Sequence, residues 1–86
     1  EKSEHKNIAT HKINYFLEYI RTQLHVPTTT INEAFYNFVA LRSGNTLAAV
    51  QELFTAIETI QHSQSIYKEQ LIALNTLIEN FKKHVS

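Results

Sequence analysis

The amino-acid sequence predicts an all-α protein, an antiparallel up-and-down four-helix bundle made by a single domain over residues 1–86. Three observations predict this fold. The length of 86 residues, with 43% hydrophobic and 19% charged residues, suits one small globular domain. Apolar residues recur at helical spacing in four segments, and no long stretch alternates apolar and polar residues. One proline, one glycine and a polar run separate these segments.

The first helix is predicted over about residues 6–25. Its apolar side chains share one arc of the helix, as a single buried stripe requires: Ala9, Ile13, Phe16, Leu17, Ile20 and Leu24. Pro27 cannot continue a helix and restricts Val26 before it. We therefore expect this helix to end near His25.

The second helix is predicted over about residues 31–43, because Thr30 and Glu33 have the spacing of a capping box. Gly44 follows the helix at the position where a left-handed residue closes the last turn. The residues expected to face the core are Ile31, Ala34, Phe35, Phe38 and Leu41.

The third and fourth helices are predicted over about residues 46–61 and 65–84. Asn45 or Thr46 caps the third helix, and Ser63 or Ser65 begins the fourth. The third carries Val50, Leu53, Phe54, Ile57 and Ile60 on its apolar side, and the fourth carries Tyr67, Leu71, Leu74, Leu77, Ile78, Phe81 and Val85. Short connections between such helices favour antiparallel neighbours.

The residue types argue against catalysis. The chain has no Cys and no Asp, which excludes thiolate chemistry and aspartate-based triads. No two of its five histidines are three or four residues apart, the spacing that lets one helix present two ligands to a metal. We therefore expect no enzyme activity, no catalytic residues, no metal and no cofactor. One alternative is a histidine phosphotransfer domain that uses His11, although Asn14 and Tyr15 occupy the places of the Lys and Gly of that motif.

Charge and hydropathy limit the partners. The formal net charge is zero with His neutral, so nucleic acid is not an expected partner. The apolar runs are too short to cross a bilayer, and no secretory signal is visible. The expected location is cytoplasmic, with partial association with a membrane as a further alternative.

Two surface features are candidates for binding a partner. Ile8, Tyr15 and Tyr19 form a second apolar ridge on the first helix, away from its core stripe, unless a neighbouring helix covers it. The end of the fourth helix adds Phe81, Lys82, Lys83 and His84. Cations are expected at a helix C-terminus in any case, and the alternative is that this end approaches an anionic membrane surface or a membrane protein.

A family resemblance gives a sharper expectation. The turn Leu41-Arg42-Ser43-Gly44-Asn45 is followed by spaced apolar and polar residues: Val50, Leu53 and Ile57, then Ser65, Glu69-Gln70, Leu74 and Leu77-Ile78. This layout resembles the small immunity proteins that protect bacteria from pediocin-like (class IIa) bacteriocins, the enterocin A immunity type.

The resemblance implies a cytosolic, non-enzymatic four-helix bundle. Such proteins associate with a membrane sugar transporter, the mannose phosphotransferase permease, when it is the receptor occupied by bacteriocin. The C-terminal half tends to decide specificity, which here means the third and fourth helices. The alternative function is a small helical adaptor that binds another protein through Ile8, Tyr15 and Tyr19. The bacteriocin, the contact residues and the oligomeric state are not fixed by the sequence.

Overall fold

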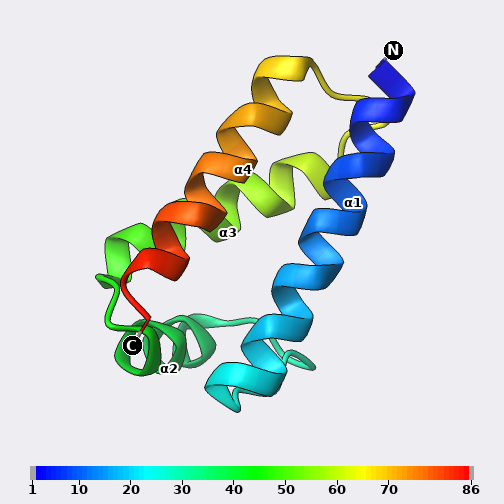
Figure 1. Cartoon of the computed structure of the whole chain (residues 1–86). Coiled ribbons are helices and arrows are strands. Elements are labelled where there is room, and N and C mark those ends of the chain that lie inside the picture. The colour runs from blue at the N-terminus through cyan, green and yellow to red at the C-terminus, as the bar shows by residue number, and fades with distance from the viewer. Residues whose placement is uncertain (1, 86) are drawn as a thin grey trace.

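The structure is a computed structural model that describes residues 2–85. Within this range the chain forms four α-helices and no strand, which confirms the predicted all-α fold. The helices in Figure 1 are α1 (Lys2–Tyr19), which continues into a π-helical turn η1 (Ile20–Leu24), then α2 (Glu33–Ser43), α3 (Leu47–Gln61) and α4 (Lys68–Lys83).

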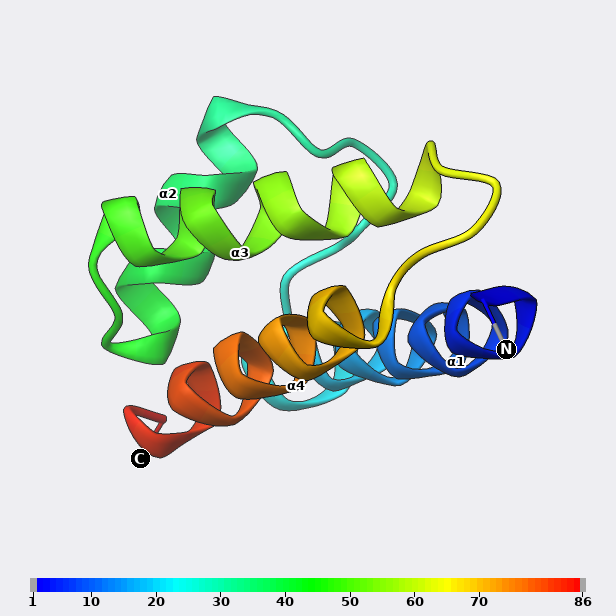
Figure 2. The same cartoon turned by 90° about the horizontal axis from the view of Figure 1, so that it is seen from above.

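The helices α1, α3 and α4 run lengthwise, and α2 crosses them at one end. Figure 1 shows α2 nearly end-on while the other three run across the view. α3 and α4 run in opposite directions, as predicted (Figure 2). α1 and α4 lie side by side in the same direction, since Lys12 contacts Asn75 and, further along both helices, Phe16 contacts Phe81. In an up-and-down bundle the first and fourth helices would be antiparallel. Here they are parallel, because α2 crosses the bundle instead of returning along its length.

Four phenylalanines, one from each helix, form the centre of the core. The ring centroid of Phe16 lies 5.1 Å from that of Phe81 and 6.0 Å from that of Phe54. Phe35 meets Phe54 edge-on at 5.3 Å. Aromatic rings bury large apolar areas and favour such tilted contacts. The stripes predicted for the first and third helices are all buried except Leu17, which is half-buried.

The start of α2 differs from the predicted one. Asn32 caps the helix, because its Oδ1 accepts a hydrogen bond from the Phe35 N–H at 3.0 Å. The predicted capping box of Thr30 and Glu33 is therefore wrong. Asn is at least as good an N-cap as Thr, and Asn32 directly precedes the first residue of α2, so Asn32 is the cap.

The starts of α3 and α4 are also fixed by side chains. Thr46 Oγ1 accepts from the Ala49 N–H at 3.1 Å, so Thr46 is the cap of α3. α4 begins at Lys68, later than the predicted Ser63 or Ser65. The connection stays extended long enough to bury Ile66 in the core, and the Tyr67 N–H then donates to Gln70 Oε1 at 2.8 Å.

The face that α2 buries is not the predicted one. Its buried residues are Phe35, Val39 and Ser43, with Tyr36 and Ala40 half-buried. Of the residues expected in the core, only Phe35 is buried, and the exposed ones are Ile31, Ala34, Phe38 and Leu41. The reason is that α2 has apolar residues around much of its circumference, while it packs on one side against α3 and η1. Its opposite side has no helix to cover it within residues 2–85.

Left-handed residues end the first two helical segments. η1 ends at Leu24, and His25 follows with a φ of 58°, which confirms the predicted end of the first helix. Gly44 has a φ of 78°, and its N–H donates to the Ala40 carbonyl at 3.1 Å, as predicted for the end of α2. A Cβ on Gly44 would lie 3.0 Å from the His84 carbonyl oxygen, so the end of α2 also packs closely against the end of α4.

Candidate functional site

The histidines do not gather into a site within residues 2–85. In this range no group of three or more His or Glu side chains could hold a metal ion. His11 is exposed on α1. His5 is half-buried, and its Nδ1 has no hydrogen-bond partner among the described residues. Likewise, no described helix combines the length and apolar character that a membrane-crossing segment needs.

The two surface features predicted from the sequence meet where α1 packs along α4. We call this region the α1/α4 seam and define it by Lys12, Tyr15, Tyr19, Asn75 and Lys82. The Lys82 Nζ lies 4.8 Å from the centroid of the Tyr19 ring, a cation–π contact. The seam also contains a hollow lined by Lys12, Tyr15, Phe16, Asn75, Ile78, Glu79 and Lys82.

Polar and aromatic groups of the seam are largely satisfied by one another. The Lys12 Nζ donates to the Asn75 Oδ1 at 3.0 Å. Tyr19 stacks on the core residue Phe16, with the centroids 6.5 Å apart, and is half-buried. Tyr15 remains 74% exposed. The seam is therefore mainly a helix-packing region, in which Tyr15 is the prominent exposed side chain.

The other predicted surface residues lie apart from this meeting point. Ile8 is 45% exposed and lies two turns before Tyr15 on α1. Lys83 and His84 are exposed at the end of α4. Phe81 is a correction: it is 3% exposed and packs on Phe16, so it belongs to the core and cannot meet a partner. It lies on the same helical stripe as Leu74 and Ile78, which is why it is covered.

The outer face of α2 exposes apolar side chains that the sequence analysis assigned to the core. We call Ala34, Phe38 and Leu41 the α2 strip, because their spacing places them on one face of the helix. Phe38 is 54% and Leu41 80% exposed. A second apolar set on the same helix, Tyr36, Val39 and Ala40, could have indicated this outcome. With two apolar faces on α2, either one could enter the core.

A groove lies between the α2 strip and the loop of residues 25–32. Two hollows share Val26, Pro27 and Phe38 in their linings, and together they form what we call the α2 groove. One hollow is lined by Val26, Pro27, Thr29, Thr30, Asn32, Ala34, Phe35 and Phe38, and the other by His25, Val26, Pro27, Phe38 and Arg42. Among residues 2–85, no Glu lines either hollow.

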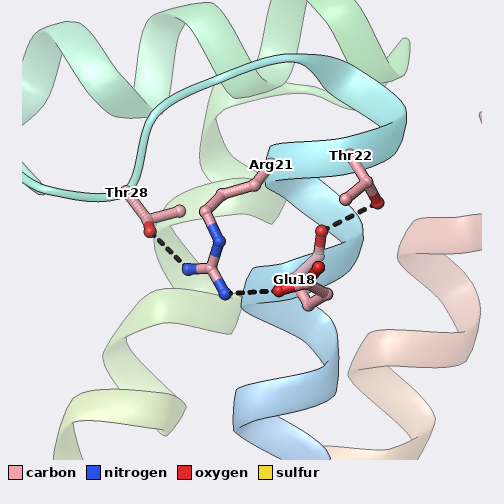
Figure 3. Close-up of polar contacts among 4 residues, drawn as sticks. All are labelled: Glu18, Arg21, Thr22 and Thr28. Carbon is pink, nitrogen blue, oxygen red and sulfur yellow. Dashed lines mark hydrogen bonds and ion pairs between the residues drawn. The ribbon is translucent and has the colours of Figure 1, made fainter.

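Polar contacts hold the loop side of this groove. The Arg21 Nη1 donates to the Thr28 Oγ1 at 2.7 Å, while its Nη2 donates to the Glu18 Oε1 at 2.8 Å (Figure 3). Thr22 Oγ1 in turn donates to the Glu18 carbonyl at 2.9 Å. The loop is thereby tied back to the end of the first helix.

Arg42 closes the other end of the groove. Its Nη1 donates to the Leu24 carbonyl at 2.9 Å and to the His25 carbonyl at 3.2 Å. These are carbonyls at the end of η1, which lack partners inside the helix. Arg42 thus joins α2 to η1, and it lines a hollow together with Phe38 and Pro27.

Comparison with known protein families gives a match over nearly the whole chain. A family model described as the DUF4350 C-terminal helical domain matches residues 1–85. Neither the curated proteins nor the solved structures contain a match to this chain.

Proposed function

Because this chain belongs to the DUF4350 C-terminal helical domain family, we propose that it is a non-catalytic helical module that binds another protein segment. The observation that carries the proposal is the exposed α2 strip beside a groove. The family description names a helical domain at the C-terminal end of DUF4350 proteins and no reaction. A binding role is compatible with that description.

The energetic argument concerns where the exposed apolar residues lie. Single exposed apolar residues are normal on a protein surface. Phe38 and Leu41 share one helix face, and Phe38 lines a groove together with Val26 and Pro27. Fully burying an exposed Leu or Phe side chain is worth about 1.5–3 kcal/mol. Phe38 is 54% and Leu41 80% exposed, so a partner that covers both would gain part of that energy from each.

Site-specific photo-cross-linking tests the proposal. A photoreactive phenylalanine analogue replaces Leu41 or Tyr15 in the whole protein, which is expressed in its source cell. We expect a discrete cross-linked product from position 41 and none, or a different one, from position 15. Equal products from both positions, or none from position 41, would contradict binding at the α2 strip.

The immunity function expected from the family resemblance remains a second candidate. The exposed Lys82, Lys83 and His84 at the end of α4 favour it, since they offer a basic end for a membrane receptor complex. Expression of the chain in a strain sensitive to class IIa bacteriocins tests it by survival. Unchanged killing across a panel of these peptides would remove this candidate.

The phosphotransfer alternative also remains a prediction. His11 is exposed on α1, as a phosphoaccepting imidazole needs to be. Incubation with a phosphodonor should then label His11, and the His11→Gln variant should stay unlabelled. A wild-type protein without label would dispose of this alternative.

A further inference from the structure

We infer that the α2 groove binds a short apolar segment of a partner protein that carries a carboxylate beside its apolar side chains. This inference rests on the proposed function and adds the chemistry of the partner. It depends on three properties of the described residues: the apolar middle of the groove, its fixed walls and the cationic group at one end.

The middle of the groove suits apolar anchors. Phe38, Val26 and Pro27 line both hollows. Leu41 extends the apolar surface by one turn along α2. A partner with two apolar side chains on one face would cover Phe38 and Leu41 together.

The walls of the groove are held in place before any partner arrives. The Arg21–Thr28 hydrogen bond fixes the loop to the first helix, and the Asn32 cap fixes the loop to the start of α2. Arg42 fixes the end of η1 to the end of α2. A preformed groove lowers the entropic cost of binding.

The charge at the groove selects the polar part of the partner. Arg42 and His25 line one hollow, and no Glu of the described part of the chain lines either hollow. The two carbonyls that Arg42 contacts carry no net charge, so these hydrogen bonds do not neutralise the positive charge of the guanidinium. Both of these hydrogen bonds use Nη1, and a guanidinium has further N–H donors on Nε and Nη2. A carboxylate matches this geometry and charge.

Selection from a random peptide library displayed on phage tests the inference, with the folded chain as target. Enriched peptides should pair aromatic or aliphatic residues with an adjacent Asp or Glu. In fluorescence polarisation, a synthetic copy of an enriched peptide should bind Phe38→Gln and Arg42→Gln at least about tenfold more weakly than wild type. Raising the salt from about 0.1 M to about 1 M should also weaken binding.

Two further variants keep the result interpretable. Arg42→Lys retains the charge but loses the planar fork, so it should bind with intermediate affinity. Tyr15→Gln changes an exposed aromatic of the α1/α4 seam and should leave the affinity unchanged. The helical signal in circular dichroism shows whether each variant has folded. If Arg42→Gln does not fold, the affinity of Arg42→Lys and the salt dependence of binding test the carboxylate instead.

The outcomes separate this inference from the proposed function. Enriched peptides that need Phe38 but are neutral or basic would overturn the carboxylate while leaving the binding role of α2. Peptides that ignore Phe38, or no enrichment at all, would overturn both. A wild-type dimer that Leu41→Gln converts to monomer would assign the strip to a second copy of the chain and overturn the partner proposed here.

Discussion

The α1/α4 seam and the outer face of α2 both expose aromatic side chains, yet their surroundings differ. In the seam, Tyr19 stacks on Phe16 and lies close to the ammonium of Lys82, so its ring already has two partners. On α2, Phe38 adjoins two hollows. Exposure alone therefore does not identify a binding surface, and the contacts around the exposed side chain are more informative.

The difference follows from which faces of each helix its neighbours cover. α1 packs against both α3 and α4, so its second apolar face is partly covered. α2 packs against α3 and η1 on one side, and the same helix carries apolar residues on the other. A helix of this kind either exposes apolar surface or acquires a partner.

The largest expected effect is the difference in stability between the variants Phe81→Ala and Phe38→Ala. Phe81→Ala should lower the free energy of unfolding by about 3–5 kcal/mol, because it removes a buried ring that packs on Phe16. Phe38→Ala should change it by less than about 0.5–1 kcal/mol, since that side chain is 54% exposed. Urea denaturation followed by circular dichroism measures both. Similar losses in the two variants would show that α2 buries a different face from the one described.

A smaller effect is expected where the end of α2 meets the end of α4. Gly44→Ala should destabilise the protein by about 1–3 kcal/mol, because the left-handed backbone disfavours a Cβ. That Cβ would also lie 3.0 Å from the His84 carbonyl oxygen. Gly44→Asn is the control, since Asn tolerates this conformation better but brings the same Cβ. If Asn restores full stability, the contact with His84 is unimportant; a residual loss in Asn measures that contact.

The sequence was sufficient where one helix face was clearly apolar. The first and third helices have single stripes, and these stripes enter the core as predicted. Pro27 and Gly44 also marked helix ends correctly, because each restricts the backbone locally. Local patterns thus gave the fold class and most of the boundaries.

Choices between competing residues could not be made from the sequence. The sequence placed both Phe35 and Phe38 of α2 in the core, and the packing against α3 buries only Phe35. The parallel pairing of α1 with α4 likewise depends on the crossing direction of α2, which no residue pattern specifies. The α2 strip was therefore missed, and Tyr19 and Lys82 were found separately without their contact.

The start of α2 gives a test of about 1 kcal/mol. Asn32→Ala should destabilise the protein by about 0.5–2 kcal/mol, because it removes the acceptor for the Phe35 N–H. Thr30→Ala, the residue that the sequence pattern favoured as the cap, should be nearly neutral. Thermal denaturation compares the two variants. The reverse order would mean that α2 begins earlier, which would also reshape the loop side of the α2 groove.

The smallest effect concerns the contact that distinguishes the seam. Lys82→Gln should lower the free energy of unfolding by about 0.5–1 kcal/mol, the usual value of an exposed cation–π pair. Lys83→Gln is the matched control, since Lys83 is the next residue on α4, is also exposed and lies in the same helical turn. Both variants lose one charge from the end of α4, so the dipole contribution largely cancels in the comparison. A double-mutant cycle with Tyr19→Leu isolates the pair, and a coupling energy near zero would leave the tyrosines of the seam as open to a partner as Phe38.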